Sequence, residues 1–224
     1  MSRDSFDVRP MPPQIGAPLL ARLQQVETAT VGHFRLHGFM TQRLRPIQEG
    51  TRIAGTAVTV RTVGIDSTAM LLVLDELRPG DVLVVDRSGE DRHAGFGAVM
   101  SAAVRGAGVV GVVIDGRACD FGDIRSQGMP LWCAGPSPML GRRLDLGGAV
   151  NVPVSCGGVT VNPGDAVLAD DTGILVIAAA EVEAIAEEGL KRQAREADVL
   201  QRMARGEKLS RIADFPRFAD YVKS

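Results

Sequence analysis

Two aspartates five residues apart are the strongest candidates for chemistry in this chain. Asp115 and Asp120 enclose a short segment that opens with a glycine, directly after the apolar run at 109–114. Carboxylate oxygens that leave coordination positions to water suit Mg²⁺ or Mn²⁺, because these ions take few protein ligands. A structural role is the alternative, since Asp115 can cap the turn and Asp120 can cap a following helix.

A second candidate is the start of the helix that we expect after the Gly-Phe-Gly segment at 95–97. Apolar residues at helical spacing follow it, and Gly106 and Gly108 end the pattern, as glycines at helix C-termini do. The first backbone N–H groups of such a helix have no partner within it, and the positive end of the helix dipole attracts anions. A small 2-keto acid can therefore chelate a metal ion at the aspartates while its carboxylate sits on this helix start.

Both candidates must be carried by a buried sheet. Residues 109–114 and 82–85 have no polar face, which is typical of strands covered on both sides. Ligand sites in α/β proteins favour the carboxyl ends of strands and the N-termini of nearby helices. We therefore expect the active site where the start of the helix meets the loop after residue 114.

The remaining chain predicts further helices and strands around this centre. Four prolines in residues 1–18 indicate an N-terminal arm, either disordered or packed on a neighbouring subunit. Residues 19–224 form one domain, because no flexible linker divides them. The mixed patterns at 51–61 and 165–177 predict antiparallel strands with one solvated face. Gly55 in the first of them marks a bulge or a close backbone approach, and residues 181–205 predict one long charged helix.

Composition limits the class of protein. The chain has 224 residues, of which 45% are hydrophobic and 23% are charged, and a formal net charge of −2. These values are ordinary for a soluble globular protein. Lys and Arg are scattered, so we expect no nucleic-acid partner, and no apolar stretch is long enough for a membrane span. Three cysteines without a paired motif, and no secretory signal at the N-terminus, favour the cytoplasm.

Residues 28–211 resemble the family of 4-hydroxy-4-methyl-2-oxoglutarate aldolases and the related regulator of ribonuclease activity A. The matching segments are RIAGTAVTVR at 52–61, RPGDVLVVD at 78–86, GAGVVGVVIDG at 106–116 and CGGVTVNPGDAVLADDTGILVI at 156–177. The resemblance implies an α/β fold of the three-layer β/β/α swivelling-domain type, as a single domain with a long C-terminal helix. It also implies homotrimers or homohexamers with sites near subunit interfaces.

The same resemblance implies a function and a set of site residues. The activity is a class II, divalent-metal-dependent retro-aldol cleavage to pyruvate, with oxaloacetate decarboxylation as a side activity. The family's metal-binding aspartate corresponds to Asp120, with Mg²⁺ or Mn²⁺ as the ion. The backbone turn that binds the substrate corresponds to Gly97, Ala98, Val99 and Met100.

One departure from the family pattern affects the chemistry. The arginine that precedes the metal-binding aspartate in the family corresponds to Cys119 here, which is shorter and a weak donor. If residues 116–119 run extended, Arg117 and Cys119 share a face. We therefore hypothesise that Arg117 supplies the missing guanidinium as a catalytic residue. The alternative is a solvent-exposed Arg117 and a retired or altered site.

Three functions follow from this pattern. The leading one is the metal-dependent lyase acting on small 2-keto acids. The second is a non-catalytic, ring-shaped regulatory binding protein of the same fold, which the lost arginine favours. The third is a metal enzyme in which Cys119 shapes the pocket for a different keto acid. His93, ahead of the glycine turn, is a minor candidate for an acid or base.

Overall fold

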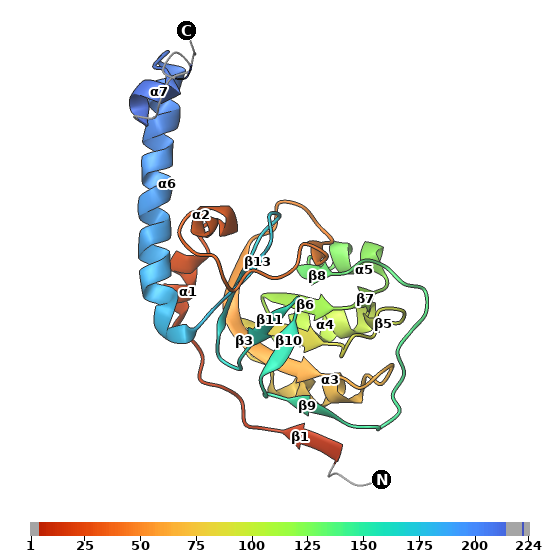
Figure 1. The fold of residues 1–224 in the computed structure, drawn as a ribbon. Helices are drawn as coiled ribbons and strands as arrows, with labels where there is room; N and C mark the ends of the chain where they lie inside the picture. Colours follow the sequence, from red (N-terminus) through yellow and green to blue (C-terminus); the bar gives the residue numbers. More distant parts are fainter. Residues whose placement is uncertain (1–4, 214–220, 222–224) are drawn as a thin grey trace.

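The computed structural model describes residues 5–213 and 221, and one mixed sheet forms its centre (Figure 1). The strand order is β1-β9-β3-β4-β6-β8-β2, and β12 pairs with both β3 and β13. These strands are β1 (Phe6–Val8), β2 (Arg45–Pro46), β3 (Ile53–Arg61), β4 (Asp81–Asp86), β6 (Gly111–Asp115), β8 (Leu131–Cys133), β9 (Gly148–Val150), β12 (Ala166–Ala169) and β13 (Ile174–Ile177).

A parallel core of β3, β4, β6 and β8 carries the site. Between successive strands of this core lie α3 (Thr68–Val73), followed by a 3₁₀ turn at Leu74–Glu76, then α4 (Ala98–Gly106) and α5 (Phe121–Ser126). These helices pack on one face of the sheet through a shared apolar cluster. Gly55 in β3 is required by a close approach, because a Cβ there would lie 2.7 Å from the carbonyl oxygen of Gly80.

The opposite face of the sheet carries a second β layer. The hairpin of β10 (Val154–Cys156) and β11 (Val159–Val161) packs there with β12 and β13 in another apolar cluster, around the fully buried Trp132. This arrangement confirms the expected fold class: an α/β domain with helices, a main sheet and a further β layer, and a long C-terminal helix.

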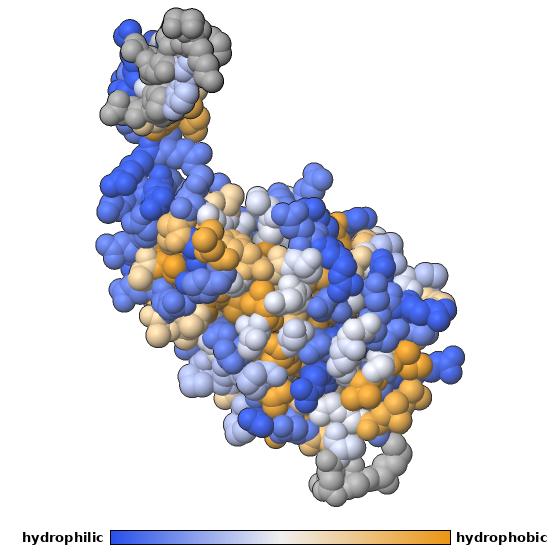
Figure 2. All heavy atoms as spheres, in the orientation of Figure 1, coloured by the Kyte–Doolittle hydropathy of each residue, from blue (hydrophilic) through white to orange (hydrophobic). Residues whose placement is uncertain are grey.

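The C-terminal helix α6 (Val182–Ala204) packs with α1 (Ala17–Leu23) and α2 (Thr28–Gly32) on the far side of β12 and β13, and a 3₁₀ turn at Ala179–Glu181 precedes it. The solvated face predicted for these strands is therefore wrong, because apolar clusters cover both faces. The outer part of α6 extends from the body to α7 (Leu209–Ile212) and carries mainly hydrophilic side chains (Figures 1 and 2). Among the described residues no helix has the length and apolarity needed to cross a membrane.

The described part of the N-terminal arm is not disordered. Strand β1 pairs in parallel with β9 of the same chain, and the Arg9 N–H donates to the Val150 carbonyl at 3.1 Å. The described part of the arm is thus ordered on its own sheet, because backbone pairing satisfies its polar groups. Residues 1–4 of the predicted arm, and 214–220 and 222–224 of the predicted domain, lie outside the described residues.

Candidate active site

A small parallel sheet joins the two stretches singled out from the sequence. It consists of β5 (Ala94–Phe96), which leads into α4, and β7 (Arg117–Ala118), which follows β6. The Cys119 N–H donates to the Phe96 carbonyl at 2.9 Å, just beyond the paired residues. The start of α4 and the loop after β6 therefore meet, and their local geometry is set by backbone hydrogen bonds.

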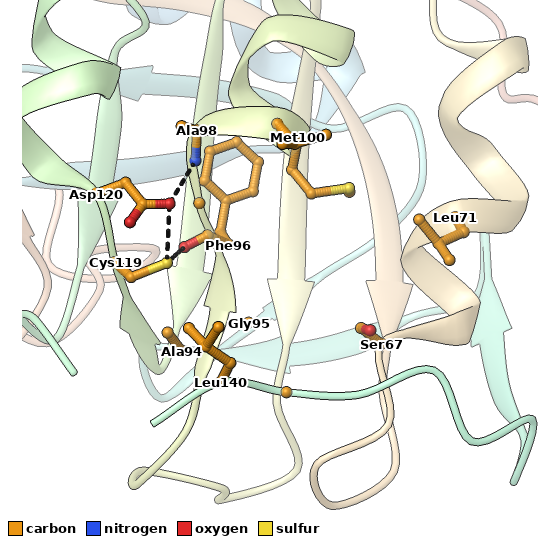
Figure 3. Close-up of a pocket in the computed structure, with 13 residues that line it drawn as sticks. Ser67, Leu71, Ala94, Gly95, Phe96, Ala98, Met100, Cys119, Asp120 and Leu140 are labelled. Carbon is orange, nitrogen blue, oxygen red and sulfur yellow. Dashed lines mark hydrogen bonds between the residues drawn. The ribbon is translucent and has the colours of Figure 1, made fainter. Parts of the chain in front are cut away.

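Asp120 precedes α5, and its carboxylate lies against the start of α4. Its Oδ2 accepts hydrogen bonds from the Ala98 N–H at 3.0 Å and from the Cys119 thiol at 3.3 Å (Figure 3). Asp120 has a φ of +53°, in the left-handed region that aspartate adopts more readily than most residues. Strained backbone of this kind is concentrated at functional sites. No described residue donates a hydrogen bond to Oδ1, so this oxygen is available to a ligand.

Gly97 precedes α4 in an extended conformation, with a φ of −150°. A Cβ at this position would lie 2.7 Å from both Asp120 Oδ2 and Cys119 Sγ. Glycine is therefore needed for the approach of the carboxylate and not for the backbone angle. Any side chain here would displace Asp120 or Cys119.

The start of α4 opens into a pocket of about 330 Å³, a size that suits a small organic ligand. The N–H groups of Val99 and Met100 make no hydrogen bond with the described residues, as expected for the first turn of a helix. The lining residues are Ser67 just before α3, Leu71 on α3, residues 94–100, Cys119, Asp120, Leu140 and Gly141 (Figure 3). Gly97, Ala98, Val99, Met100, Cys119 and Asp120 are thus gathered in one pocket.

Cys119 is a neutral donor in this pocket. Burial, and then the hydrogen bond to and negative charge of Asp120, raise the pKa of its thiol to about 11. The thiol also lies 3.5 Å from the Phe96 carbonyl oxygen. At neutral pH it is a weak hydrogen-bond donor, not a nucleophile.

Arg117 lies elsewhere. Its Nε donates to Asp91 Oδ1 at 3.0 Å and its Nη1 donates to the Ala134 carbonyl at 3.0 Å. Asp91 also pairs with Arg43, at 3.2 Å. Arg117 does not line the pocket, so the structure does not bring this predicted catalytic residue together with Asp120.

Two other candidates also lie outside the pocket. Asp115 pairs with Arg43, and its Oδ2 accepts the Gly157 N–H at 2.7 Å, which is a structural role. His93 places Nδ1 at 2.9 Å from Glu90 Oε1. Neither side chain lines the pocket.

The donor set for a divalent cation consists of one carboxylate. The described residues contain no group of three His, Cys, Asp or Glu side chains placed to hold an ion. Mg²⁺ can be bound by one or two carboxylates, with water and substrate oxygens as its other ligands. Asp120 therefore fits such an ion as a single protein ligand.

One wall of the pocket could not be found from the sequence. Leu140 and Gly141 belong to a loop that carries no motif, and it is held in place by buried Asp66. Asp66 accepts the N–H groups of Leu144 at 3.0 Å and Leu146 at 2.7 Å. No local pattern signals such a long-range pairing.

The comparisons with known proteins agree with this fold. A family model described as "RraA-like: Aldolase/RraA" matches residues 26–176, from α2 through β13. That range covers more than half of the chain and includes the residues at the start of α4 and after β6. The chain belongs to this family.

Individual relatives carry both names of the family. One from Halalkalibacterium halodurans, named "putative 4-hydroxy-4-methyl-2-oxoglutarate aldolase", is 32% identical over 69% of this chain and 73% of its own. The crystal structure of Streptomyces coelicolor RraAS2, described as an unusual member of the RNase ES inhibitor RraA family, has a TM-score of 0.75 at 30% identity over 84% of this chain and 98% of its own. The RNA-processing inhibitor RraA from Thermus has a TM-score of 0.57 at 30% identity, over 62% of this chain and 84% of its own.

Proposed function

We propose that this protein is a divalent-metal-dependent lyase, which cleaves keto acids of the 4-hydroxy-4-methyl-2-oxoglutarate type to pyruvate and decarboxylates oxaloacetate. The observation that carries the proposal is the Asp120 carboxylate, held at the open start of α4 within a pocket for a small ligand. Family membership and the name of the Halalkalibacterium relative support the same reaction class. Mg²⁺ or Mn²⁺ is the expected cofactor.

Five residues of the pocket have a part in this reaction. Asp120 Oδ1 would hold the ion, which when bound supplies Lewis-acid polarisation of the keto oxygen. The N–H groups of Val99 and Met100 bind and orient the substrate carboxylate at the positive end of the helix dipole. The Cys119 thiol and the Ala98 N–H hold Oδ2, which leaves Oδ1 for the ion.

Protons are exchanged with solvent in this scheme. The C3–C4 bond breaks, its electron pair passes into the pyruvate enolate, and the C4 hydroxyl loses its proton as C4 becomes a carbonyl. Water then protonates the enolate carbon. Among the described residues, no histidine and no second carboxylate lines the pocket to act in its place.

Arg117 remains a predicted catalytic residue. To reach the keto oxygen it has to leave Asp91 and the Ala134 carbonyl. Stabilisation of a developing oxyanion by one such donor is worth about 10²–10³ in rate. A lyase that lacks this donor is accordingly a slow one.

We also propose that the protein is a cytoplasmic homotrimer or homohexamer with the pocket at a subunit interface. Large apolar side chains beside the pocket are exposed: Val99 by 84%, Leu140 by 57% and Leu71 by 39%. Grouped apolar exposure around a pocket is typical of a surface that another protein covers. Analytical ultracentrifugation measures the assembly directly, and a monomer at micromolar concentration would contradict this part.

A non-catalytic regulator is the second candidate. Cys119 in place of the family arginine favours it, and so does the description of the Streptomyces structure as a member of an RNase-inhibitor family. A metal enzyme acting on a different keto acid is the third candidate, because a neutral thiol in place of a guanidinium changes which substrate oxygens the pocket can bind.

The test is pyruvate release from 4-hydroxy-4-methyl-2-oxoglutarate and from oxaloacetate, with Mg²⁺ or Mn²⁺ and with EDTA. We expect metal-dependent turnover that Asp120→Ala abolishes. Asp123→Ala is the matched control, because this exposed aspartate lies on α5, the helix directly after Asp120 in the chain, and does not line the pocket. Metal binding without turnover would support another substrate. Neither turnover nor metal binding would refute the lyase and favour the regulator.

A further inference from the structure

A fully buried arginine lies behind the floor of the pocket. Arg87 directly follows β4, and its side chain is 0% exposed. A Cβ on Gly95 would lie 2.9 Å from Arg87 Nε and 3.0 Å from Cζ and Nη1, and one on Gly141 would lie 4.0 Å from Nη2. Both glycines line the pocket. At Gly95, therefore, only backbone separates the guanidinium from the ligand space.

The hydrogen bonds of Arg87 leave its charge incompletely satisfied. Nη1 donates to Thr62 Oγ1 at 3.2 Å and Nη2 donates to Glu90 Oε2 at 3.2 Å. The buried Nε has no partner among the described residues. Burial of a guanidinium with an orphan N–H costs stability, and such costs are typically retained where they serve a function.

Glu90 offsets only part of this charge. Its carboxylate also accepts the backbone N–H groups of Arg92 and His93 and lies 2.9 Å from His93 Nδ1. Burial alone would raise the pKa of Glu90, but these hydrogen bonds and the one from Arg87 lower it to about 2. The negative charge is thus shared among several donors, while Glu90 itself does not line the pocket.

The lining of the pocket carries negative charge, in contrast to the positive charge of Arg87 behind it. Asp120 carries the one carboxylate among the lining residues that the structure describes, and no arginine or lysine is among them. An approaching carboxylate therefore meets a negative group, whereas the start of α4 and Arg87 are positive features next to the lining. A fixed charge behind a wall of low polarisability acts on a ligand that it does not touch.

We propose that Arg87 is a specificity-determining residue, whose positive charge behind Gly95 makes the pocket select small carboxylates. The ligand class rests on the proposed function, and the electrostatic role rests on the position of Arg87. Such a charge attracts the anion without fixing its orientation, which the N–H groups of Val99 and Met100 supply. The pocket is accordingly expected to accept several small keto acids of different shape.

The alkylation of Cys119 measures the electrostatic effect of Arg87 on the pocket, and it needs neither substrate nor metal. Iodoacetate and iodoacetamide alkylate the same thiolate, so the ratio of their rates cancels the thiolate fraction and reports the potential at Sγ. The reaction is run near pH 9 in the intact protein, because the pKa of this thiol is about 11. Peptide mass spectrometry separates Cys119 from the buried Cys133 and Cys156.

We expect two substitutions to change the ratio of the two alkylation rates in opposite directions. Arg87→Met lowers the iodoacetate-to-iodoacetamide ratio about tenfold, and Glu90→Gln raises it, because each removes a charge of opposite sign behind the same wall. Structural damage would move the ratio in the same direction in both variants. Arg78→Met is the matched control, because Arg78 pairs with Asp81 at the same spacing and at 3.2 Å, but does not lie against any glycine of the pocket.

An unchanged ratio in Glu90→Gln, or shifts of the same sign in both variants, overturns the role of Arg87. Glu90→Gln keeps Arg87 in place and decides the question alone if Arg87→Met does not fold. Pyruvate release by the unmodified protein separately tests the proposed lyase activity. The failure of one proposal is therefore distinguishable from the failure of the other.

Discussion

Replacing Gly97 with alanine adds a methyl group where the structure has no room for one. The new Cβ would lie 2.7 Å from Asp120 Oδ2 and from Cys119 Sγ, whereas ordinary contacts begin at 3.4 Å. The carboxylate must retreat by about 0.7 Å, which breaks its 3.0 Å hydrogen bond with the Ala98 N–H. Misplacement of a catalytic group by about 1 Å costs about 10²-fold in rate. We expect kcat/KM to fall by about 10- to 100-fold.

The assay is metal-dependent pyruvate release, measured together with the thermal unfolding midpoint. Gly106→Ala is the matched control in the same helix, because no atom lies within 4 Å of its added Cβ. We expect this control to keep full activity and to gain up to about 1 kcal/mol of stability, from the helix propensity of alanine. If Gly97→Ala retains activity within twofold of the unmodified protein, the close approach does not set the position of Asp120 and the reasoning fails.

Four further predictions follow from the same contacts. Burial would raise the pKa of Asp66, but its hydrogen bonds more than offset this effect and lower the pKa to about 2. The ionised carboxylate therefore contributes about 2 kcal/mol to the free energy of unfolding above about pH 4, and this contribution is lost as the pH falls toward 2. Asp66→Asn removes this pH dependence in urea unfolding, and an unaltered pH profile would contradict it. Asp91→Ala releases Arg117; if Arg117 is catalytic, turnover rises several-fold and the gain is lost in the double variant with Arg117→Ala, whereas unchanged turnover contradicts the role. Alkylation of Cys119 by iodoacetamide accelerates about tenfold per pH unit between pH 7 and 10, since the pKa of its thiol is about 11, and a plateau near pH 8 would refute that value. A cation at Asp120 would have one protein ligand among the described residues, so calorimetry is expected to show tighter Mn²⁺ binding with pyruvate present, and equal affinities would argue against a shared site.

Much of the fold follows from local pattern. The apolar runs that form β4 and β6, the glycine turns around α4 and the charged helix α6 (Val182–Ala204) all appear where periodicity and turn chemistry predict them. The predictions fail where distant segments decide the environment. The expected solvated face of β12 and β13 is covered by α1 and α6, which lie far away in the sequence.

The sequence by itself identified two segments of the candidate site, the start of α4 and the loop after β6. A glycine before a helix and an aspartate after a buried strand are local signals, and parallel pairing of their flanking strands brings Gly97 and Asp120 together. Only the tertiary structure decided which arginine lies behind this pocket. The direction of a long, flexible side chain depends on partners elsewhere in the chain. Arg117 binds Asp91 outside the pocket, and the absence of side chains at Gly95, Gly116 and Gly141 leaves the space in which Arg87 is buried.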